Sequence, residues 1–257
     1  MSLLHVFSLS IIEGITEFLP VSSTGHLILA SKLLGIMESD FTKTFEIAIQ
    51  LGAIMAVVFL YFKKFTQSLD LCKKLLVAFI PTAIVGFFLY PFIKGFLLGS
   101  SIVTLNALFW GGIVLILVEL LLKRKTDKSL PAEGQITYKQ SFLIGVFQSI
   151  SVIPGVSRAA ATIVGGLLIG LKRETATEFS FLLAVPTMFA ATSLDIYKSA
   201  SYLNSTNIPA LLLGSFISFV FAAISIKFLI NYVKNNNFIS FGVYRIILAI
   251  LFWILVK

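Results

Sequence analysis

Long apolar runs dominate this chain and restrict what it can fold into. Six of them, each about twenty residues long, lie near 44–62, 73–92, 101–122, 178–197, 208–230 and 239–256. An α-helix rises about 1.5 Å per residue, so runs of this length cross the roughly 30 Å hydrocarbon core of a bilayer. Because lipid offers no partner to unpaired backbone groups, the runs predict transmembrane helices and an all-α polytopic membrane protein.

The composition agrees with this class and excludes others. Of the 257 residues, 58% are apolar and 12% are charged, with a mean hydropathy of +0.99, whereas soluble domains carry about 25% charged residues. The net charge of +8 could favour nucleic acid, but the basic residues lie in short linkers between apolar runs, which is typical of membrane topology. We therefore expect a lipid bilayer and no nucleic acid as the partner. The single cysteine, Cys72, excludes an internal disulfide.

Two further apolar stretches, near 3–34 and 140–170, are interrupted at their centres. Pro20 and Pro154 break them, and polar residues follow each proline. Neither half of either stretch can cross alone with an apolar core, so each is predicted to be a re-entrant hairpin of two helices. The predicted fold is a single membrane domain, 1–257, with six transmembrane helices and two re-entrant helical hairpins.

The hairpins also point to an internal repeat. Ser23 follows Pro20 by three residues, as Ser157 follows Pro154. Each half then contains one hairpin and three spans, and because three is odd the second half is predicted to lie inverted in the membrane. Inverted repeats place their site at mid-depth, where the broken helices meet. The halves are predicted at about 1–122 and 139–257, joined by a basic cytoplasmic linker near 123–139.

The distribution of basic residues orients this topology. Thirteen of the twenty lysines and arginines fall on one predicted face and five on the other. Since cytoplasmic loops are enriched in these residues, the rich face is expected to be cytoplasmic and the first hairpin to open to the outside. Arg245, inside the last span, is expected to extend its side chain to the basic face.

Acidic residues precede the first break. Glu13 and Glu17 are four residues apart, so both project from one face of the incoming helix. Two close carboxylates either bind a divalent cation or share a proton. The alternative is a pair that faces a water-filled cavity without taking part in chemistry.

Hydroxyl residues and a histidine follow that break. Ser22, Ser23 and Thr24 are predicted to cap the returning helix, whose free N–H groups then form an anion site at mid-depth. Ser23 is the best nucleophile candidate because His26 lies one turn further on and could activate it, or could itself attack phosphorus. An inert buried histidine is the alternative.

The second break supplies a cation. Ser157 is predicted to cap the returning helix, and Arg158 lies on its first turn. Arginine binds phosphate through a rigid bidentate fork and stabilises the charge of a phosphoryl-transfer transition state. Thr162, one turn later, is expected to face the same cavity. The alternative for Arg158 is a salt bridge to a glutamate without any ligand.

Three motifs run in order along the chain: Glu13-Gly-x-Thr-Glu17-Phe-Leu-Pro-Val-Ser-Ser-Thr-Gly-His26, Pro154-Gly-x-Ser-Arg158-x-x-x-Thr162, and Glu178-Phe-Ser-Phe-Leu-Leu-Ala-Val-Pro186. With them the whole chain closely resembles the bacterial undecaprenyl-diphosphate phosphatases of the bacitracin-resistance type. One departure is that Ala159 and Ala160 stand where the family usually has Ser-Gly.

The resemblance implies removal of the terminal phosphate from undecaprenyl diphosphate, which recycles the lipid carrier for peptidoglycan synthesis and confers bacitracin resistance. It implies a divalent cation, Mg²⁺ or Ca²⁺, and a place in the bacterial plasma (inner) membrane with the site facing the periplasm. The functional residues that it implies are Glu13, Glu17, Ser23, His26 and Arg158, supported by Ser22, Ser157 and Thr162.

We expect a phosphate site in which a cation held by Glu13 and Glu17 helps to neutralise the diphosphate. The nucleophile is left open between Ser23, His26 and water, and a homodimer is also left open. One rival is an inverted-repeat lipid-phosphate transporter or flippase. Another is a phosphatidate-type phosphatase, but that class usually needs a second downstream histidine, and this chain has two histidines, His5 and His26. The residues expected to bind phosphate are Ser22, Thr24, Ser157, Arg158 and Thr162.

Overall fold

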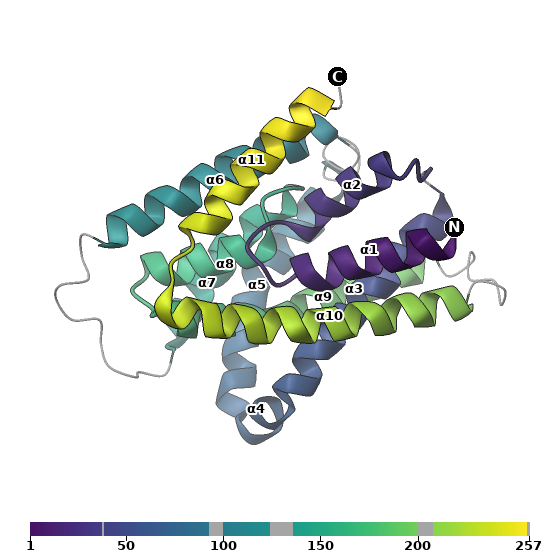
Figure 1. Ribbon diagram of the computed structural model, residues 1–257. Helices are drawn as coiled ribbons and strands as arrows, with labels where there is room; N and C mark the ends of the chain where they lie inside the picture. The colour runs from purple at the N-terminus through teal and green to yellow at the C-terminus, as the bar shows by residue number, and fades with distance from the viewer. Residues whose placement is uncertain (38, 93–99, 124–135, 200–207, 256–257) are drawn as a thin grey trace.

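The computed structural model describes a helical protein, and Figure 1 shows the arrangement of its helices. In the described residues, which are 1–37, 39–92, 100–123, 136–199 and 208–255, all regular structure is helical. The α-helices are α1 (Leu3–Thr16), α2 (Ser23–Leu33), α3 (Asp40–Leu60), α4 (Phe62–Gln67), α5 (Leu69–Phe92), α6 (Ser101–Lys123), α7 (Tyr138–Ser149), α8 (Arg158–Leu168), α9 (Arg173–Ser199), α10 (Ile208–Asn235) and α11 (Ile239–Leu255).

The described helices match a protein that crosses a membrane several times. Four contain a segment long and apolar enough to span a bilayer, and α1, α8 and α11 are shorter apolar helices. Large apolar side chains also point outward, as is expected of surfaces that contact lipid. The chain is therefore a polytopic helical membrane protein. The four segments are Phe41–Leu60, Leu69–Leu89, Ser101–Leu122 and Ile208–Asn235.

The two broken stretches fold into helix pairs of matching design. The returning helices α2 and α8 each have 11 residues. The residue before each has a positive φ, 72° at Ser22 and 73° at Ser157, and its hydroxyl accepts a bond from the backbone N–H three residues later. Gly35 and Gly170, just beyond the ends of these helices, also have positive φ.

This match corrects the expected register of the repeat. The spacing from the prolines paired Ser23 with Ser157, but the capping geometry pairs Ser22 with Ser157. Capping depends on backbone conformation and on a free helix N-terminus, and neither of these is fixed by the distance from a proline. Arg158 therefore occupies the place in its helix that Ser23 occupies in the other.

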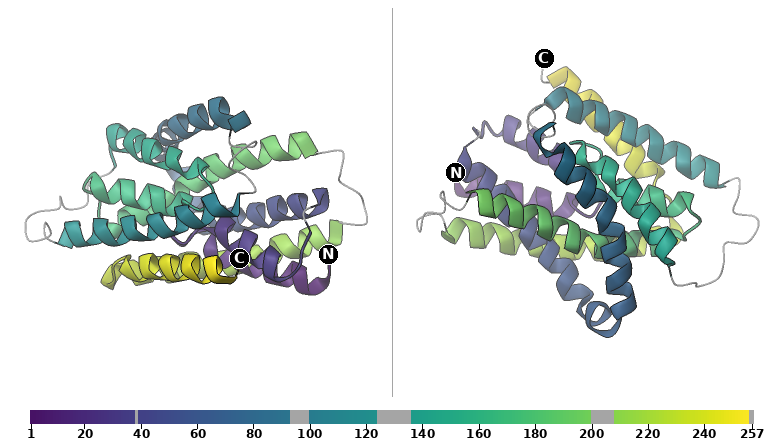
Figure 2. Two further views of the ribbon diagram at one scale, coloured as in Figure 1. Left: turned by 90° about the horizontal axis from the view of Figure 1, so that it is seen from above. Right: turned by 180° about the vertical axis from the view of Figure 1, so that it is seen from behind.

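Each half of the chain packs against the other half. Helix α1 lies along α10, as Figure 1 shows, and α7 packs against α5. Helices α6 and α11 run side by side in both figures, and Figure 2 shows the same arrangement from above and from behind. A side-chain carbon added to Gly112 would lie 2.6 Å from the carbonyl oxygen of Gly242, and one added to Gly242 would lie 2.7 Å from that of Gly112. Small residues thus let these helices approach closely, as is common in membranes.

Glycine also allows α3 and α10 to meet, which gives a stability prediction. A Cβ at Gly52 would lie 2.1 Å from the carbonyl oxygen of Ser215, whereas one at Gly86 would have no neighbour within 4 Å. We expect Gly52→Ala to destabilise the protein, since overpacking costs about 1–3 kcal/mol. Gly86→Ala should leave stability equal or higher, since alanine favours helix by about 1 kcal/mol. Thermal unfolding in detergent measures both, and equal melting temperatures would contradict this close packing.

Candidate active site

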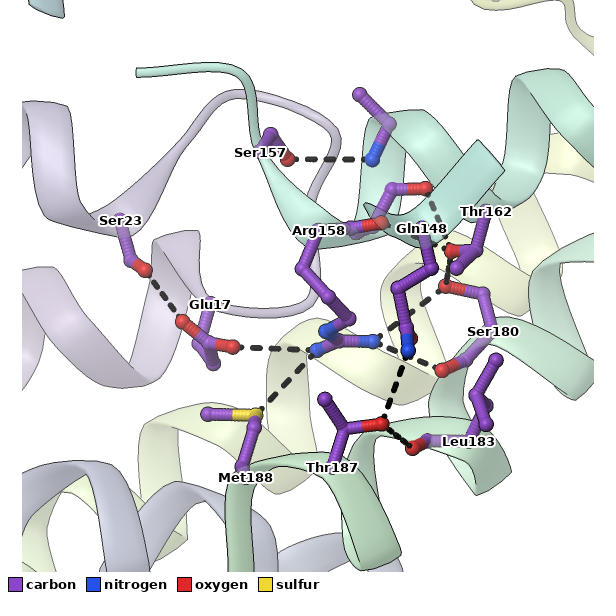
Figure 3. A network of polar contacts seen from close by, with 12 residues as sticks. Glu17, Ser23, Gln148, Ser157, Arg158, Thr162, Ser180, Leu183, Thr187 and Met188 are labelled. Carbon is purple, nitrogen blue, oxygen red and sulfur yellow. Dashed lines mark hydrogen bonds and ion pairs between the residues drawn. The ribbon is translucent and has the colours of Figure 1, made fainter. Parts of the chain in front are cut away.

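The two helix breaks meet around an ion pair, which Figure 3 shows. Arg158 donates from Nη2 to Glu17 Oε1 at 3.1 Å, joining the second break to the first. The Ser23 hydroxyl donates to the other oxygen of the same carboxylate. Both charged side chains are largely buried, with 10% of the Arg158 side chain and 6% of the Glu17 side chain exposed. The structure therefore brings together three predicted site residues from the two halves of the sequence.

Further contacts fix the guanidinium of Arg158. Its Nη1 donates to the carbonyl oxygen of Ser180 at 2.8 Å, and the guanidinium carbon lies 5.5 Å from the centre of the Phe18 ring. The Thr162 hydroxyl lies within hydrogen-bond distance of the backbone oxygen of Arg158 and of the Ser180 hydroxyl. It therefore braces this turn, and it does not line the cavity described below. The Nε of Arg158 is buried without a hydrogen-bond partner. One donor of the guanidinium thus remains for a ligand.

Both returning helices direct their N-termini toward this ion pair. Ser22 and Ser157 each satisfy one backbone N–H of the first turn, and the other N–H groups there remain available. The N-terminus of a helix carries a partial positive charge, so two such ends beside an arginine favour an anion. Thr24 lies in the same turn as Ser23 and lines the cavity.

Glu13 lies one turn before Glu17 and is 1% exposed. Both of its carboxylate oxygens are buried without a hydrogen-bond partner. Among the described residues, no group of three or more His, Cys, Asp or Glu side chains gathers as a metal site. However, Mg²⁺ usually takes one or two carboxylates and completes its shell with water and substrate phosphate. Glu13 and Glu17 supply the type of oxygen ligand that such an ion takes, and the oxygens of Glu13 have no hydrogen-bond partner.

His26 has different neighbours from those expected. Its Nδ1 pairs with the carbonyl oxygen of Ser22 at 2.7 Å, and its Nε2 pairs with the Tyr244 hydroxyl at 2.6 Å. The ring stacks on Tyr244 with centroids 5.6 Å apart. Ser23 bonds to Glu17 and not to His26, because side chains tilt toward the helix N-terminus and Ser23, as the first residue, leans toward the end of α1. The expected Ser23–His26 pair is not formed in this structure.

A cavity of about 640 Å³ opens beside the ion pair. Both hairpins contribute to it, together with α3, α5 and α9, so it lies where the two halves of the chain meet. Glu13, His26 and Thr162 are not part of its wall. The residues that line it are Glu17, Ser22, Ser23, Thr24, Gln50, Phe79, Thr82, Ala83, Gly86, Phe87, Ser151, Val152, Ile153, Pro154, Gly155, Ser157, Arg158, Thr187, Met188, Ala190 and Ala191.

Comparison with known proteins assigns this chain to a family. Residues 6–251 match the family model described as bacitracin resistance protein BacA, which is nearly the whole chain. The chain belongs to the bacitracin resistance protein BacA family.

Curated relatives match the chain along nearly its full length. The chain is 56% identical over 256 residues to a protein of Persephonella marina named undecaprenyl-diphosphatase, covering 100% of both chains. It is 52% identical over 254 residues to a protein of the same name from a Sulfurihydrogenibium species, covering 99% of each. It is 48% identical to one from Aquifex aeolicus, covering 95% of this chain and 94% of the relative.

The sequence reasoning missed several polar residues of this BacA family member. The carbonyl oxygen of Ser180 accepts a hydrogen bond from Arg158. The feature of the sequence that could have identified Ser180 is its place in the third motif. Gln148 is fully buried and donates to the hydroxyls of Thr82 and Thr187 at 2.9 and 3.1 Å, which joins α7 to α5 and α9 at the cavity wall. No spacing rule connects these three residues, because they come from separate helices.

Arg245 corrects the expectation that it extends to the basic face. The side chain is 0% exposed, and each of its nitrogens donates to the backbone. Carbonyl groups of both breaks are among the acceptors, so Arg245 connects the two hairpins to α6 and α11. A guanidinium has five N–H donors, and five oxygens surround this one. The acceptors are the carbonyl oxygens of Pro20, Ala107, Leu108, Gly155 and Val156.

This arrangement predicts that lysine cannot replace Arg245. Arg245→Lys keeps the charge but offers three donors on a single nitrogen, so buried carbonyl groups would lose their partners at about 1–3 kcal/mol each. We expect a clear fall in the melting temperature of the detergent-solubilised protein. Lys227→Arg, at an exposed position on α10, is the control and should change nothing. An Arg245→Lys protein as stable as this control would show that these five hydrogen bonds are dispensable for stability.

Proposed function

We propose that this chain hydrolyses undecaprenyl diphosphate to undecaprenyl phosphate and inorganic phosphate. The observation that carries the proposal is the buried Arg158–Glu17–Ser23 contact at the meeting point of two helix N-termini. Full-length similarity to proteins named undecaprenyl-diphosphatase supports it. The reaction breaks the anhydride bond to the outer phosphorus, and the monophosphate lipid returns as a carrier for cell-envelope synthesis. Lowering the amount of the diphosphate, the lipid that bacitracin binds, gives resistance.

The residues divide the work as follows. Arg158, with its unpaired Nε–H, and the N-termini of α2 and α8 bind the outer phosphate and stabilise the charge that develops there. Glu17 accepts the hydrogen bond of Ser23, so it is placed to take a proton from that hydroxyl or from a water. The attacking group is Ser23 or this water. Ser22, Thr24 and Ser157 contribute hydroxyls and shape the phosphate pocket.

His26 acts on the same loop from its far side. It holds the carbonyl of Ser22 and contacts α11 through Tyr244, so it fixes the start of α2 where Ser23 lies. Thr162 similarly fixes the first turn of α8 through Arg158 and Ser180. We therefore assign both residues a positioning role, because they fix the loops that carry Ser23 and Arg158.

A divalent cation, Mg²⁺ or Ca²⁺, belongs to the proposal. Glu13 and Glu17 would hold it, since the buried oxygens of Glu13 have no other partner. When bound, it supplies positive charge that offsets the negative charge of the diphosphate. The protein side chains then orient the phosphate and move the proton.

We further propose six transmembrane helices and two re-entrant hairpins in an inverted repeat, with the site open to the periplasmic side of the bacterial inner membrane. The matching caps of α2 and α8 support the repeat. On α5 and α9 the cavity residues come after the basic starts of these helices, near Lys73 and Arg173, which supports an opening on the opposite face. The basic linker residues 124–135 and the side chains of Lys94, Lys198 and Lys257 lie outside the described part of the chain.

The transporter or flippase alternative is not favoured. The full-length relatives carry the name of a phosphatase, and the cavity contains a carboxylate, a hydroxyl and a guanidinium in direct contact. A carrier needs to bind and release its lipid unchanged, and it has no need for such a contact.

A change to either member of the ion pair should strongly lower turnover. We expect Arg158→Lys and Glu17→Gln each to lower phosphate release from undecaprenyl diphosphate by at least about 100-fold, the usual scale for one lost transition-state contact. Glu178→Gln, which removes the more exposed ion pair with Lys64, is the matched control and should stay within about twofold of wild type. Normal turnover in both site variants, in folded protein, would refute the assignment.

The cation can be tested without relying on activity. Mg²⁺ or Ca²⁺ should raise the melting temperature of the wild-type protein, because a ligand that binds the folded state stabilises it. Glu13→Gln should remove most of this rise, and a chelator should lower phosphate release by wild type. An identical shift in wild type and Glu13→Gln would place the cation elsewhere.

A further inference from the structure

The cavity wall contains polar side chains that the proposed mechanism does not use. That mechanism assigns Arg158 and the starts of α2 and α8 to the outer phosphate. The substrate carries a second phosphate, which is bonded to the outer one on one side and to the prenyl chain on the other. A ligand for this inner phosphate is therefore to be sought among the unassigned polar residues of the wall. They are Gln50, Thr82, Ser151 and Thr187.

The two threonines have no hydrogen to offer a phosphate. The Thr82 hydroxyl donates to the carbonyl oxygen of Gly145 at 3.2 Å. The Thr187 hydroxyl donates to the carbonyl oxygen of Leu183 at 2.8 Å. Both hydroxyl oxygens accept from Gln148. Because a hydroxyl has a single hydrogen, only lone pairs remain on these two oxygens, and lone pairs repel the oxygens of a phosphate.

Gln50 has donors to offer. In the described part of the chain, neither its side chain nor that of Ser151 has a hydrogen-bond partner. The amide of Gln50 carries two N–H donors, whereas the hydroxyl of Ser151 carries one. Gln50 is also partly buried, and a polar group held away from water without a partner costs free energy. Of the four wall residues, Gln50 is therefore the strongest candidate for binding an anion.

The place of Gln50 in its helix supports a functional role. It lies at the middle of the apolar segment Phe41–Leu60, and no polar side chain follows it in that segment. Polar residues at the centre of a membrane-spanning helix are costly and are usually functional.

Helix α3 also brings Gln50 to the carboxylates of the site. This helix packs against α1, and Glu46 of α3 interacts electrostatically with Glu13 of α1. Gln50 lies one turn beyond Glu46, as Glu17 lies one turn beyond Glu13, and residues four apart share a helix face. Gln50 and Glu17 both line the cavity. One molecule in the cavity can thus meet Arg158, Glu17 and Gln50.

We propose that the side-chain amide of Gln50 binds the inner phosphate of the substrate, the one that stays on the lipid, through its N–H groups. The inference rests on the proposed function and deepens it. When the anhydride bond to the outer phosphorus breaks, the bridging oxygen keeps the electron pair and stays with the inner phosphate. Donors placed there stabilise the charge that this leaving group gains. A neutral amide binds more weakly than a charged group, so the lipid monophosphate can leave afterwards.

The two inorganic anions that correspond to the two subsites test the proposal without relying on turnover. In excess Mg²⁺, inorganic diphosphate should raise the melting temperature of the wild-type protein more than an equal concentration of inorganic phosphate, because it reaches Gln50 as well as Arg158. Gln50→Leu removes the donors at similar volume. Most of the difference between the anions should disappear in this variant, and the rise with phosphate should be that of wild type.

Thr82→Val is the matched control. It changes another polar residue of the same wall, but one whose hydrogen is already donated to a backbone carbonyl. The difference between diphosphate and phosphate should therefore be kept in this variant.

Kinetics give a second readout. With undecaprenyl diphosphate, Gln50→Leu should lower kcat/KM by about tenfold, the scale of one or two neutral hydrogen bonds. Inhibition by inorganic phosphate, which binds at Arg158, should be unchanged. A general disturbance of the fold would weaken both.

Three results would overturn the subsite. Wild type could be stabilised equally by the two anions, or a folded Gln50→Leu protein could keep the wild-type difference. Alternatively, Gln50→Glu could keep the difference. Glutamate offers oxygens in place of the amide donors, so that result would make residue 50 a cation ligand. Failure of the proposed function reads differently. Wild type would then release no phosphate from undecaprenyl diphosphate, while the preference for inorganic diphosphate and its loss in Gln50→Leu would remain.

Discussion

A buried guanidinium, that of Arg245, holds the site together. The two breaks leave backbone carbonyl groups in the protein interior, where an unpaired carbonyl is costly. Arg245 donates to carbonyls of Pro20 in the first break and of Gly155 and Val156 in the second, so it satisfies both with one side chain. Gly111 makes room for it, since a Cβ there would lie 2.2 Å from Nη2. These five hydrogen bonds therefore hold the two breaks in a fixed relative position.

The two breaks share one backbone arrangement but differ in the side chain that it positions. The same backbone device appears twice, with a capping serine of positive φ followed by a helix of 11 residues. At the first helical position, one copy carries Ser23 and the other Arg158. Glu17 lies between them and contacts both. The matching starts of α2 and α8 thus place a hydroxyl and a cation around one carboxylate, and neither break supplies all three groups alone.

The sequence was informative wherever the physical cause is local. Apolar runs predicted the long helices, prolines and polar residues predicted the breaks, and the cost of burying charges predicted that Glu17 and Arg158 would share a site. The catalytic roles of Glu13, Glu17, Ser23, His26 and Arg158 all remain predictions. The partner of Ser23 was wrong because the i,i+3 spacing to His26 carried no information on how α1 and α2 turn about each other.

Long-range contacts were beyond sequence reasoning. Arg245 and Pro20 are 225 residues apart. No residue near Arg245 in the sequence indicates that carbonyl groups from two loops surround its side chain. The sequence alone therefore predicted that the side chain would extend to water. Gln148 presents the same difficulty, since Thr82 and Thr187 gain meaning only when α5, α7 and α9 are placed side by side.

The cross-packing of the halves limits how this molecule can move. A methyl group on Gly14 would lie 2.6 Å from the backbone oxygen of Ser218, and one on Gly145 would lie 2.0 Å from that of Ala78. At both places the first helix of one half, α1 or α7, packs directly against the backbone of a long helix of the other half, α10 or α5. A rigid-body rotation of the N-terminal half against the C-terminal half would break both contacts. We therefore expect turnover to proceed without large movements of the helices.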